Sequence, residues 1–286
     1  MIDAAEVEAA FLAACRDEIE APKPGNVHIF GSGHGMTAEH FLVSAAASAK
    51  VLCTPGKPVG QRIHDAVAAS FAAVGMNTNL GIVLLCAPLA AAAERTELDA
   101  ALQTALAKVL VALDKKDTQH VFAAIRLANP GGLGTAARYD VHGAADVTLL
   151  LAMGEAAERD RIAAQYISNF HDVFVTGLTT LDRAHGCGLK PPWSTIAVYL
   201  TFLAAFPDSH ISRKHGSATA LEVQREASEM LSLFQTKGEK CLSDLLAFDE
   251  GLKSRRRNPG TSADLTVATL FADRLRNILL KHRNDG

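Results

Sequence analysis

The sequence has few aromatic residues and no large excess of positive or negative charge. Each of these two features argues against a class of protein. Phenylalanine, tyrosine and tryptophan make up 6% of the 286 residues, and the formal net charge is only -3. Strands favour aromatic and β-branched residues, so the first shortage argues against a large sheet. A near-neutral chain has no overall attraction to nucleic acid or to an anionic membrane. We therefore expect neither as a partner.

Paired cysteines and long apolar runs are missing as well. The five cysteines are odd in number and no two are spaced as CxxC, so we expect no disulfide framework and no zinc site. The longest apolar run, residues 81–93, is too short to span a bilayer. The first twenty residues carry acids where a signal peptide would carry lysine or arginine. These patterns predict a cytoplasmic protein.

Alanine-rich segments with helical periodicity occupy most of the chain, and alanine is the best helix former. Glycine, proline and asparagine separate these segments. We find no long linker and no fixed-period repeat. The pattern predicts an all-α fold, at least two-thirds helical: a multi-helix bundle in which residues 1–286 form a single domain with Gly/Pro-rich loops. The expected helices are 3–20, 37–53, 58–74, 80–93, 96–113, 117–127, 144–152, 155–182, 193–205, 217–235, 238–253 and 261–282.

Five polar loop stretches are candidates for function, and the first joins Glu18 to residues 22–28 (PKPGNVH). Two prolines stiffen the chain around Lys23, and a stiff loop can hold an ammonium group as a fixed charge for phosphate. A rigid helix end with a solvated lysine explains the same pattern equally well.

The second stretch, residues 75–81 (GMNTNLG), precedes an apolar helix. Free N–H groups at a helix start attract anions, although capping by Thr78 or Asn79 explains part of the pattern. The third, residues 129–134 (NPGGLG), lets backbone approach a ligand closely. It matches neither GxGxxG nor a P-loop, so no dinucleotide-binding fold follows from it. Asp140 lies shortly after it.

The fourth stretch, residues 208–216 (DSHISRKHG), puts a carboxylate, an imidazole and two cations close together. Cations are unfavourable at a helix start, so this cluster suits an anionic ligand. In the fifth, residues 258–264 (NPGTSAD), Thr261 and Asp264 have the spacing of a capping box. Asp264 would serve equally well as a Mg²⁺ ligand beside phosphate.

In this order, the five stretches resemble motifs of the triphosphoribosyl-dephospho-CoA synthase family. Its members carry a glutamate before PKPG, then GxNTxxG, a glycine-rich motif, a DTN-like motif before Arg-x-Gly, and a late G[TS]xAD motif. Those positions correspond here to Glu18 with residues 22–25, and to residues 75–81, 131–134, 208–216 and 260–264. The resemblance spans nearly the whole chain.

The resemblance implies a helical enzyme that cleaves the N-glycosidic bond of ATP and releases adenine. The 5-triphosphoribosyl group then joins a ribose hydroxyl of dephospho-CoA. Enteric members have NTHKG where residues 77–81 are NTNLG, GAHxDM where residues 31–36 are GSGHGM, and DTN where residues 208–210 are DSH. Their TGARGEA motif is replaced by residues 131–140. The chain is more similar to a branch from methanogens and from methylotrophs that use tetrahydromethanopterin, so a precursor of that cofactor is our hypothesis for the acceptor.

Ribosyl transfer passes through an oxocarbenium-like state and needs a polyphosphate clamp, a stabilised leaving group and a base. We expect Mg²⁺ held by Glu18 and Asp264, with Asp208, His210 and Asp140 as candidate catalytic residues. The expected substrate-binding positions are Lys23, His28, Asn77, Thr78, Asn79, Gly131, Gly132, Arg213, Lys214 and Thr261.

The expected partners are a nucleotide or phosphoribosyl donor, ATP or phosphoribosyl pyrophosphate, and a small cofactor-precursor acceptor. Three alternatives stay open: a phosphoribosyltransferase, a Mg²⁺-dependent ribosyl hydrolase and a non-catalytic ligand-binding protein. Paired DD motifs in loops would favour the hydrolase, and the sequence has none. The retained polar residues Glu18, Lys23 and Arg213 argue against a protein without catalysis. A homodimer is left open.

Overall fold

The computed structural model describes residues 2–96 and 101–284, and within these ranges it contains helices and no strand. Helix accounts for 72% of the structure, which confirms the all-α prediction. The nearest approach to a sheet is a pair of isolated antiparallel bridges, His28 with Gly31 and Gly33 with Met36. Among the described residues, no helix has both the length and the apolar content needed to cross a membrane.

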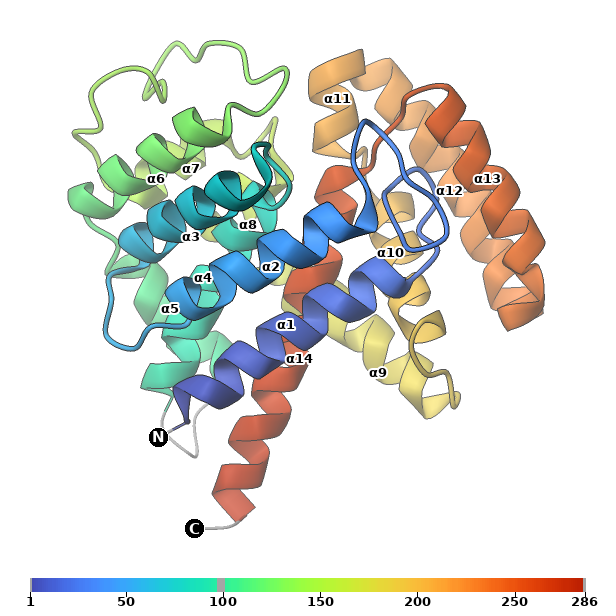
Figure 1. The fold of residues 1–286 in the computed structure, drawn as a ribbon, viewed down its shortest axis with the longest axis horizontal. Helices are drawn as coiled ribbons and strands as arrows, with labels where there is room; N and C mark the ends of the chain where they lie inside the picture. Colours follow the sequence, from blue (N-terminus) through green and yellow to red (C-terminus); the bar gives the residue numbers. More distant parts are fainter. Residues whose placement is uncertain (1, 97–100, 285–286) are drawn as a thin grey trace. The chain divides into compact units, whose positions relative to one another are not determined.

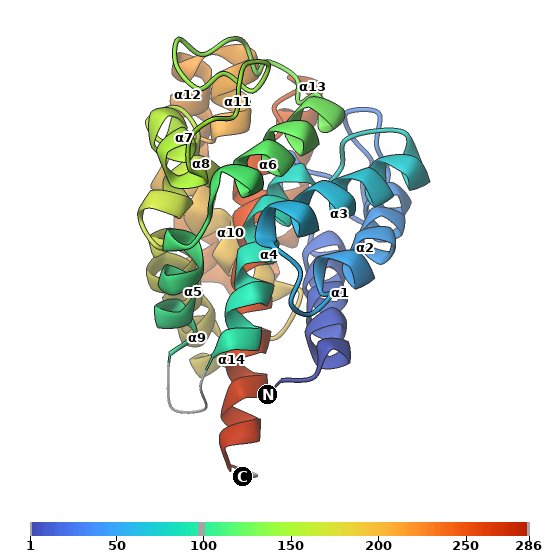
Figure 2. The same cartoon turned by 90° about the vertical axis from the view of Figure 1, so that its left-hand side faces the viewer.

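Figures 1 and 2 show the helices and their connections. The helix bounds are α1 (Ala4–Glu20), α2 (Ala38–Leu52), α3 (Val59–Val74), α4 (Leu80–Arg95), α5 (Leu102–Val111), α6 (Lys115–Ala128), α7 (Leu149–Ala156), α8 (Arg161–Ile167), the π-helix η1 (Asp172–Gly177), α9 (Leu178–Gly186), α10 (Trp193–Ala205), α11 (Ser209–His215), α12 (Ser217–Lys237), the 3₁₀-helix η2 (Gly238–Cys241), α13 (Leu242–Ser254) and α14 (Gly260–Asn284). The longest connections in the described residues are the loops between α1 and α2 and between α6 and α7.

The chain forms two compact units, and their boundaries fall within α1, α2 and α14. Unit 1 consists of Met1–Ala14, Val43–His171 and Phe271–Gly286, and unit 2 consists of Cys15–Leu42 and Asp172–Leu270. The single domain expected over residues 1–286 stays a prediction.

Helix α4 is the buried centre of unit 1. Its residues from Ile82 to Ala93 are all buried, as expected for a helix that is apolar on every side. It packs against α3, α5, α6 and α8, and α3 also packs against α6 (Figure 2). The latter contact is close because Gly60 of α3 has no side chain: a Cβ there would lie 2.4 Å from the Asp117 Cα.

Helix α10 has the same role in unit 2. Tyr199, Leu200, Phe202 and Leu203 are fully buried, and α10 packs against α9, η1 and α12. Helix α12 in turn contacts α11 and α13. The loops that carry three of the five polar stretches surround this core: residues 22–28, 208–216 and 258–264 all belong to unit 2.

Two expected helices and one expected loop differ from the observed structure. The helix expected over 155–182 is wrong: it is interrupted after α8, where Asn169 and Phe170 adopt positive φ angles of 52° and 57°, and the chain continues as η1 and α9. Residues 209–215, expected to be a loop, form α11 with Asp208 as its N-cap. The helix expected over 144–152 begins at Leu149. Part of the expected helix 96–113 lies outside the described residues.

Candidate functional site

Lys23 in the PKPG loop of unit 2 is sealed inside the protein. Its Nζ is 2.9 Å from Glu18 Oε1 and donates a 2.8 Å hydrogen bond to the Val27 carbonyl. Both side chains are at most 5% exposed. Burial lowers the pKa of Lys23 and raises the pKa of Glu18, because both charged forms lose their hydration. In this arrangement the pair braces the loop, and neither group is open to a ligand.

The backbone of the same loop is tied to three other elements. The Tyr199 hydroxyl donates to the Pro24 carbonyl at 2.6 Å, and the Gly25 N–H donates to Asp249 Oδ1 at 2.8 Å. The Asn26 amide donates to Asn258 Oδ1 at 2.8 Å. Gly25 has a φ of +79°, and a Cβ there would lie 2.8 Å from the Arg257 carbonyl oxygen. The PKPGN segment is therefore a rigid junction of unit 2.

His28 continues this junction into a buried charged cluster with Asp249 and Lys253 of α13. Asp249 Oδ2 lies 3.1 Å from His28 Nε2 and 2.9 Å from Lys253 Nζ. Lys253 Nζ also donates to the Gly31 carbonyl at 3.0 Å. Burial is the main influence on the pKa of His28 and lowers it. His28 Nδ1 is buried and finds no hydrogen-bond partner among the described residues.

A second group of imidazoles and cations surrounds α11. Burial, followed by the charges of Lys214, Arg213, His34 and His215, lowers the pKa of His210 to about 3. His210 is therefore a neutral imidazole near pH 7, and its Nε2 is buried without a hydrogen-bond partner within the described part of the chain. Its ring packs against Gly260, where a Cβ would lie 2.4 Å from Nδ1.

His34 links the two groups. Its Nε2 lies 2.9 Å from the Gly25 carbonyl oxygen, so this nitrogen is the donor. Burial lowers the pKa of His34, and the charges of Lys214 and Lys253 lower it further. Partial burial and then the Arg213 guanidinium lower the pKa of Lys214. The loop after α1, α11 and α13 thus bring positive charge and neutral imidazoles together within unit 2.

Asp208 is the N-cap of α11 and uses both carboxylate oxygens. Oδ1 accepts from the His210 and Ile211 N–H groups at 2.9 and 3.2 Å, and Oδ2 accepts from the Ser262 N–H and hydroxyl at 2.8 and 2.9 Å. Burial raises its pKa despite these four bonds. Asp208 therefore joins α11 to α14 and has little capacity left to accept a proton from a substrate.

The fifth stretch begins α14, with Thr261 and Asp264 in its first turns. Thr261 Oγ1 accepts a 3.2 Å hydrogen bond from the His210 N–H, so it links the start of α14 to α11. Asp264 is partly exposed. Together with Ser262, these residues place the start of α14 against the His210 segment.

The Asn-Thr-Asn stretch of unit 1 is anchored by three buried serines. Thr78 Oγ1 donates to Ser44 Oγ at 2.6 Å, and Asn79 Nδ2 donates to Ser70 Oγ at 2.9 Å and to Ser48 Oγ at 3.3 Å. Asn77 Oδ1 accepts from the N–H of Leu80, the first residue of α4, at 3.3 Å, whereas the N-cap residue Asn79 makes no side-chain capping bond. Thr78 and Asn79 are buried, while Asn77 is partly exposed. The side chains of Thr78 and Asn79 therefore hold this loop against α2 and α3.

The glycine-rich stretch of unit 1 belongs to an exposed loop between α6 and α7 (Figure 1). Gly132 has a positive φ of 76° and Gly131 precedes it. Asp140 closes the loop by accepting from the Ala136 N–H at 2.6 Å and the His142 N–H at 2.8 Å. These backbone hydrogen bonds lower the pKa of Asp140, which makes it a weaker base.

A metal cage made of protein groups alone does not fit this chain. Across residues 2–96 and 101–284, no three His, Cys, Asp or Glu side chains gather in a way that could hold a metal ion. Glu18, one expected ligand, is paired with Lys23. A magnesium ion bound mainly by substrate phosphates would need fewer protein ligands.

Two residues that build the unit 2 site were not singled out from the sequence. Asp249 and Tyr199 reach the PKPG segment from 224 and 175 positions away. Asn258 and Ser262, within the fifth stretch, bond to Asn26 and Asp208. Lys253 belonged to a basic run that is typical of a solvated surface. The sequence pattern that could have pointed to Tyr199 in α10 is a polar hydroxyl group on an otherwise apolar helical face.

Comparison with known proteins identifies the family of the chain and a solved structure with the same fold. A family model described as ATP:dephospho-CoA triphosphoribosyl transferase (CitG) matches residues 4–282. A solved structure from Archaeoglobus fulgidus, described provisionally as a triphosphoribosyl-dephospho-CoA synthase, matches with 24% identity and a TM-score of 0.64. That match covers 81% of this chain and 96% of that chain; at this identity it shows the fold. The comparison with curated proteins gave no match.

Proposed function

Because the chain belongs to the ATP:dephospho-CoA triphosphoribosyl transferase family, we propose that it moves the triphosphoribosyl group of ATP to a hydroxyl of a cofactor precursor. The observation that carries this proposal is the family match over residues 4–282. The local arrangement in unit 2 is consistent with it, because cations and neutral imidazoles gather there.

The proposed reaction exchanges one bond at the ribose C1 for another. The N-glycosidic bond of ATP breaks, and adenine leaves with the bonding electron pair and takes up a proton. The acceptor hydroxyl oxygen bonds to C1 and loses its proton. The triphosphate stays on the transferred ribose, so cationic groups must bind its negative charges throughout the reaction. The ribose itself passes through an oxocarbenium-like transition state.

We assign the triphosphate to the positive side chains of α11 and to Lys253. Arg213 and Lys214 follow His210 on α11, and their charges act on His210. Charge-assisted hydrogen bonds from such groups to phosphate are roughly twice as strong as neutral ones. Lys23, although a cation in the same unit, lies fully buried against Glu18, so its proposed role is to support the loop.

His210 is proposed to contact the substrate through its unpartnered Nε2. With a pKa of about 3 it is a poor general base at neutral pH but a good neutral hydrogen-bonding group. Burial, helped by the surrounding cations, keeps it neutral, so it can approach the polar atoms of ribose or adenine without adding a further charge.

Magnesium is proposed to enter with the nucleotide, as part of the MgATP substrate. Mg²⁺ in nucleotide enzymes commonly keeps one or two carboxylates and several substrate oxygens as ligands. Asp264, at the start of α14 and partly exposed, is the proposed carboxylate. This proposal requires no protein cage.

The acceptor is proposed to be either a ribose hydroxyl of dephospho-CoA or a hydroxyl of a tetrahydromethanopterin precursor. The family description names dephospho-CoA. The replacement of an enteric His-Lys pair by Asn79 and Leu80, both buried in unit 1, supports a different acceptor. Phosphoribosyl pyrophosphate remains the alternative donor, and its use would release pyrophosphate instead of adenine.

The test is adenine release measured by chromatography with MgATP alone, with dephospho-CoA and with a tetrahydromethanopterin precursor that has not yet received its ribose. Acceptor-dependent release of one adenine per product is the expected result. Arg213→Gln should raise the KM for ATP, whereas Arg225→Gln, on α12, is the matched control. Release with water as the only acceptor would identify a hydrolase, and pyrophosphate release from phosphoribosyl pyrophosphate would identify the alternative donor. Either result would overturn the proposal, as would absence of turnover with every donor.

A further inference from the structure

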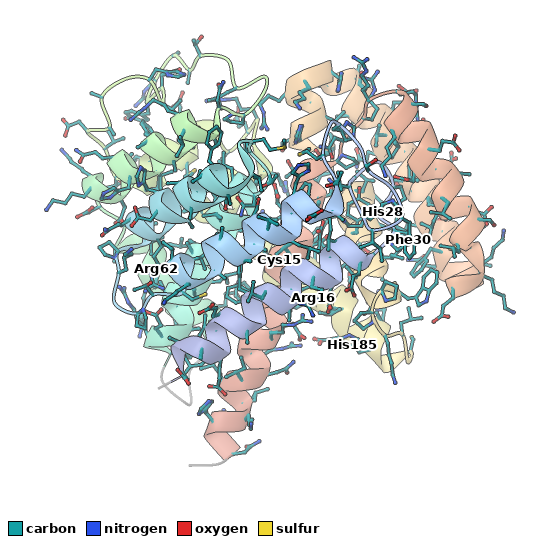
Figure 3. The ribbon with its side chains drawn as sticks, viewed as in Figure 1. Cys15, Arg16, His28, Phe30, Arg62 and His185 are labelled. Carbon is teal, nitrogen blue, oxygen red and sulfur yellow. The ribbon has the colours of Figure 1, made fainter. Side chains whose placement is uncertain are left out.

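The loop after α1 presents two large apolar side chains at the tip of a tight turn. Ile29 and Phe30 are 49% and 67% exposed, and they lie between His28 and Gly31, which bond to each other in both directions at 3.2 and 3.0 Å. The Ile29 N–H also donates to the Ile19 carbonyl at 3.0 Å. Figure 3 labels His28 and Phe30 on this turn. The backbone on both sides of the tip is therefore held in place.

The turn also rests directly on charged groups of unit 2. Lys253 Nζ donates to the Gly31 carbonyl at 3.0 Å, and a Cβ on Gly31 would lie only 2.7 Å from that Nζ. The rings of His28 and Phe30 are tilted relative to each other, with the ring centroids 6.2 Å apart. A single exposed apolar side chain is ordinary. A phenyl ring on a fixed turn, next in sequence to a carbonyl group that a lysine holds, is a less ordinary arrangement.

Two further observations mark this place as a binding site. His28 is 2% exposed, and its Nδ1 has no hydrogen-bond partner among the described residues. The charges of Lys253 and Lys214 both act on His34, which belongs to the same loop. An apolar ring, an unpaired imidazole nitrogen and several cations match a ligand that combines a flat heterocycle with phosphates.

We propose that Phe30 is a stacking platform for the adenine ring of an adenine nucleotide, with Lys253 and the cations of α11 facing its phosphates. This proposal deepens the proposed function and rests on it. Every purine offers a π face, so stacking on an aromatic side chain needs no further recognition group. Phe30 is a specificity-determining residue here and takes no part in bond breaking. Uniform binding of this kind changes KM more than kcat.

The test is calorimetry of the full-length protein with ATP, dephospho-CoA and inorganic tripolyphosphate. Phe30→Ala should weaken binding of at least one adenine-containing ligand by about 10-fold, a typical effect of one stacking contact, and leave tripolyphosphate binding unchanged. The two nucleotides separate the donor from the acceptor as the source of the stacked ring. Ile29→Ala, the neighbouring exposed apolar residue, is the matched control and should bind all three ligands as the parent does.

Phe30→Trp adds a second readout to a chain that has a single tryptophan, Trp193. This variant should keep the affinity of the parent, and its added fluorescence should be quenched by the stacking nucleotide but not by tripolyphosphate. The proposal would be overturned if Phe30→Ala lost affinity equally for nucleotide and for tripolyphosphate, or if it lost affinity for neither nucleotide. A parent that binds no adenine nucleotide would overturn it together with the proposed function. If Phe30→Ala loses affinity only for nucleotide, but the parent shows no acceptor-dependent adenine release, the stacking site is supported and only the proposed transfer reaction is contradicted.

Discussion

Lys23 shows how burial can give a charged residue a structural role in place of a ligand-binding one. In the sequence, a lysine between two prolines is a candidate phosphate ligand. In the structure its ammonium is completely covered and is satisfied by Glu18 and the Val27 carbonyl. Removing one partner would leave an uncompensated buried charge, which is more harmful than losing an exposed ion pair. Its role in substrate binding stays a prediction, and the structure supports a bracing role instead.

The neutral state of His210 leads to a pH prediction at the same scale. Its native pKa is about 3, against an ordinary value of 6.5. Below pH 6.5 the unfolded chain takes up this proton and the native protein does not, so stability falls as the pH falls towards 3. His210→Gln removes this loss. Between pH 7 and pH 5, the free energy of unfolding of the variant should rise relative to the parent by about 2 kcal/mol.

Urea denaturation at pH 7, 6 and 5 measures the difference, and an NMR titration of the His210 ring provides an independent check. The ring resonances should stay constant from pH 7.5 to pH 5. Parallel stability curves for parent and variant, or a titration midpoint near 6.5, would show that the imidazole is not held neutral.

At the scale of helices, the close contact between α3 and α6 depends on a glycine. A Cβ on Gly60 would lie within 2.9 Å of three backbone atoms of Asp117. The Gly60 N–H also donates to Asp117 Oδ1 at 2.7 Å. Asp117 in turn completes the capping box of α6 by accepting from the Asp114 N–H at 3.0 Å. The same carboxylate therefore caps one helix and joins it to another.

Gly60→Ala should consequently separate α3 from α6. Overpacking against side chains costs about 1–3 kcal/mol, and backbone atoms yield less easily, so we expect a loss of about 3 kcal/mol in the free energy of unfolding. The matched control is Gly251→Ala in α13, where a Cβ meets nothing within 4 Å. That change should stabilise the helix by about 0.5–1 kcal/mol. Similar unfolding midpoints for the two variants would show that the contact is not tight.

At the scale of the whole molecule, the polar stretches are divided between the two compact units. The PKPG, Asp208 and Asp264 stretches belong to unit 2, and the Asn-Thr-Asn and glycine-rich stretches belong to unit 1. Within each unit, buried hydrogen bonds fix the stretches in place. Convergence of all five on a single cleft stays a prediction.

Magnesium dependence is the prediction that involves the whole molecule with its substrate. Asp264→Asn removes one carboxylate charge at the start of α14, so MgATP binding should weaken by about 10-fold, a loss typical of a metal-supporting group. Binding of ATP without Mg²⁺ should change little. Calorimetry with and without Mg²⁺ measures the coupling, and the unfolding midpoint should change little because Asn and Asp have similar helix propensities.

Glu239→Gln, an exposed carboxylate on η2, is the control for a general change in charge. It should leave the Mg²⁺ dependence as in the parent. If Asp264→Asn also leaves that dependence unchanged, Asp264 has only a structural role in the first turns of α14.

The helices were largely predictable because local patterns determine them. Alanine content, apolar periodicity and the Gly/Pro breaks place α1, α3, α4, α10 and α14 within a few residues of their observed bounds. The break at Asn169 and Phe170 was missed because no glycine or proline marks it, although both residues have positive φ. Helix α11 was missed because its seven residues are too few to show a period.

The sequence by itself determined the helical class, the positions of the polar loops and the family resemblance. These properties depend on residue type and on spacing along the chain. Only the tertiary structure decided which polar residues are supports and which face outward. Asp249, Tyr199 and Asn258 reach the PKPG loop from 175 to 232 positions away. Long-range contacts of this kind bury Lys23 and keep His210 neutral, because the loss of hydration depends on what surrounds a group in space and leaves no local pattern in the sequence.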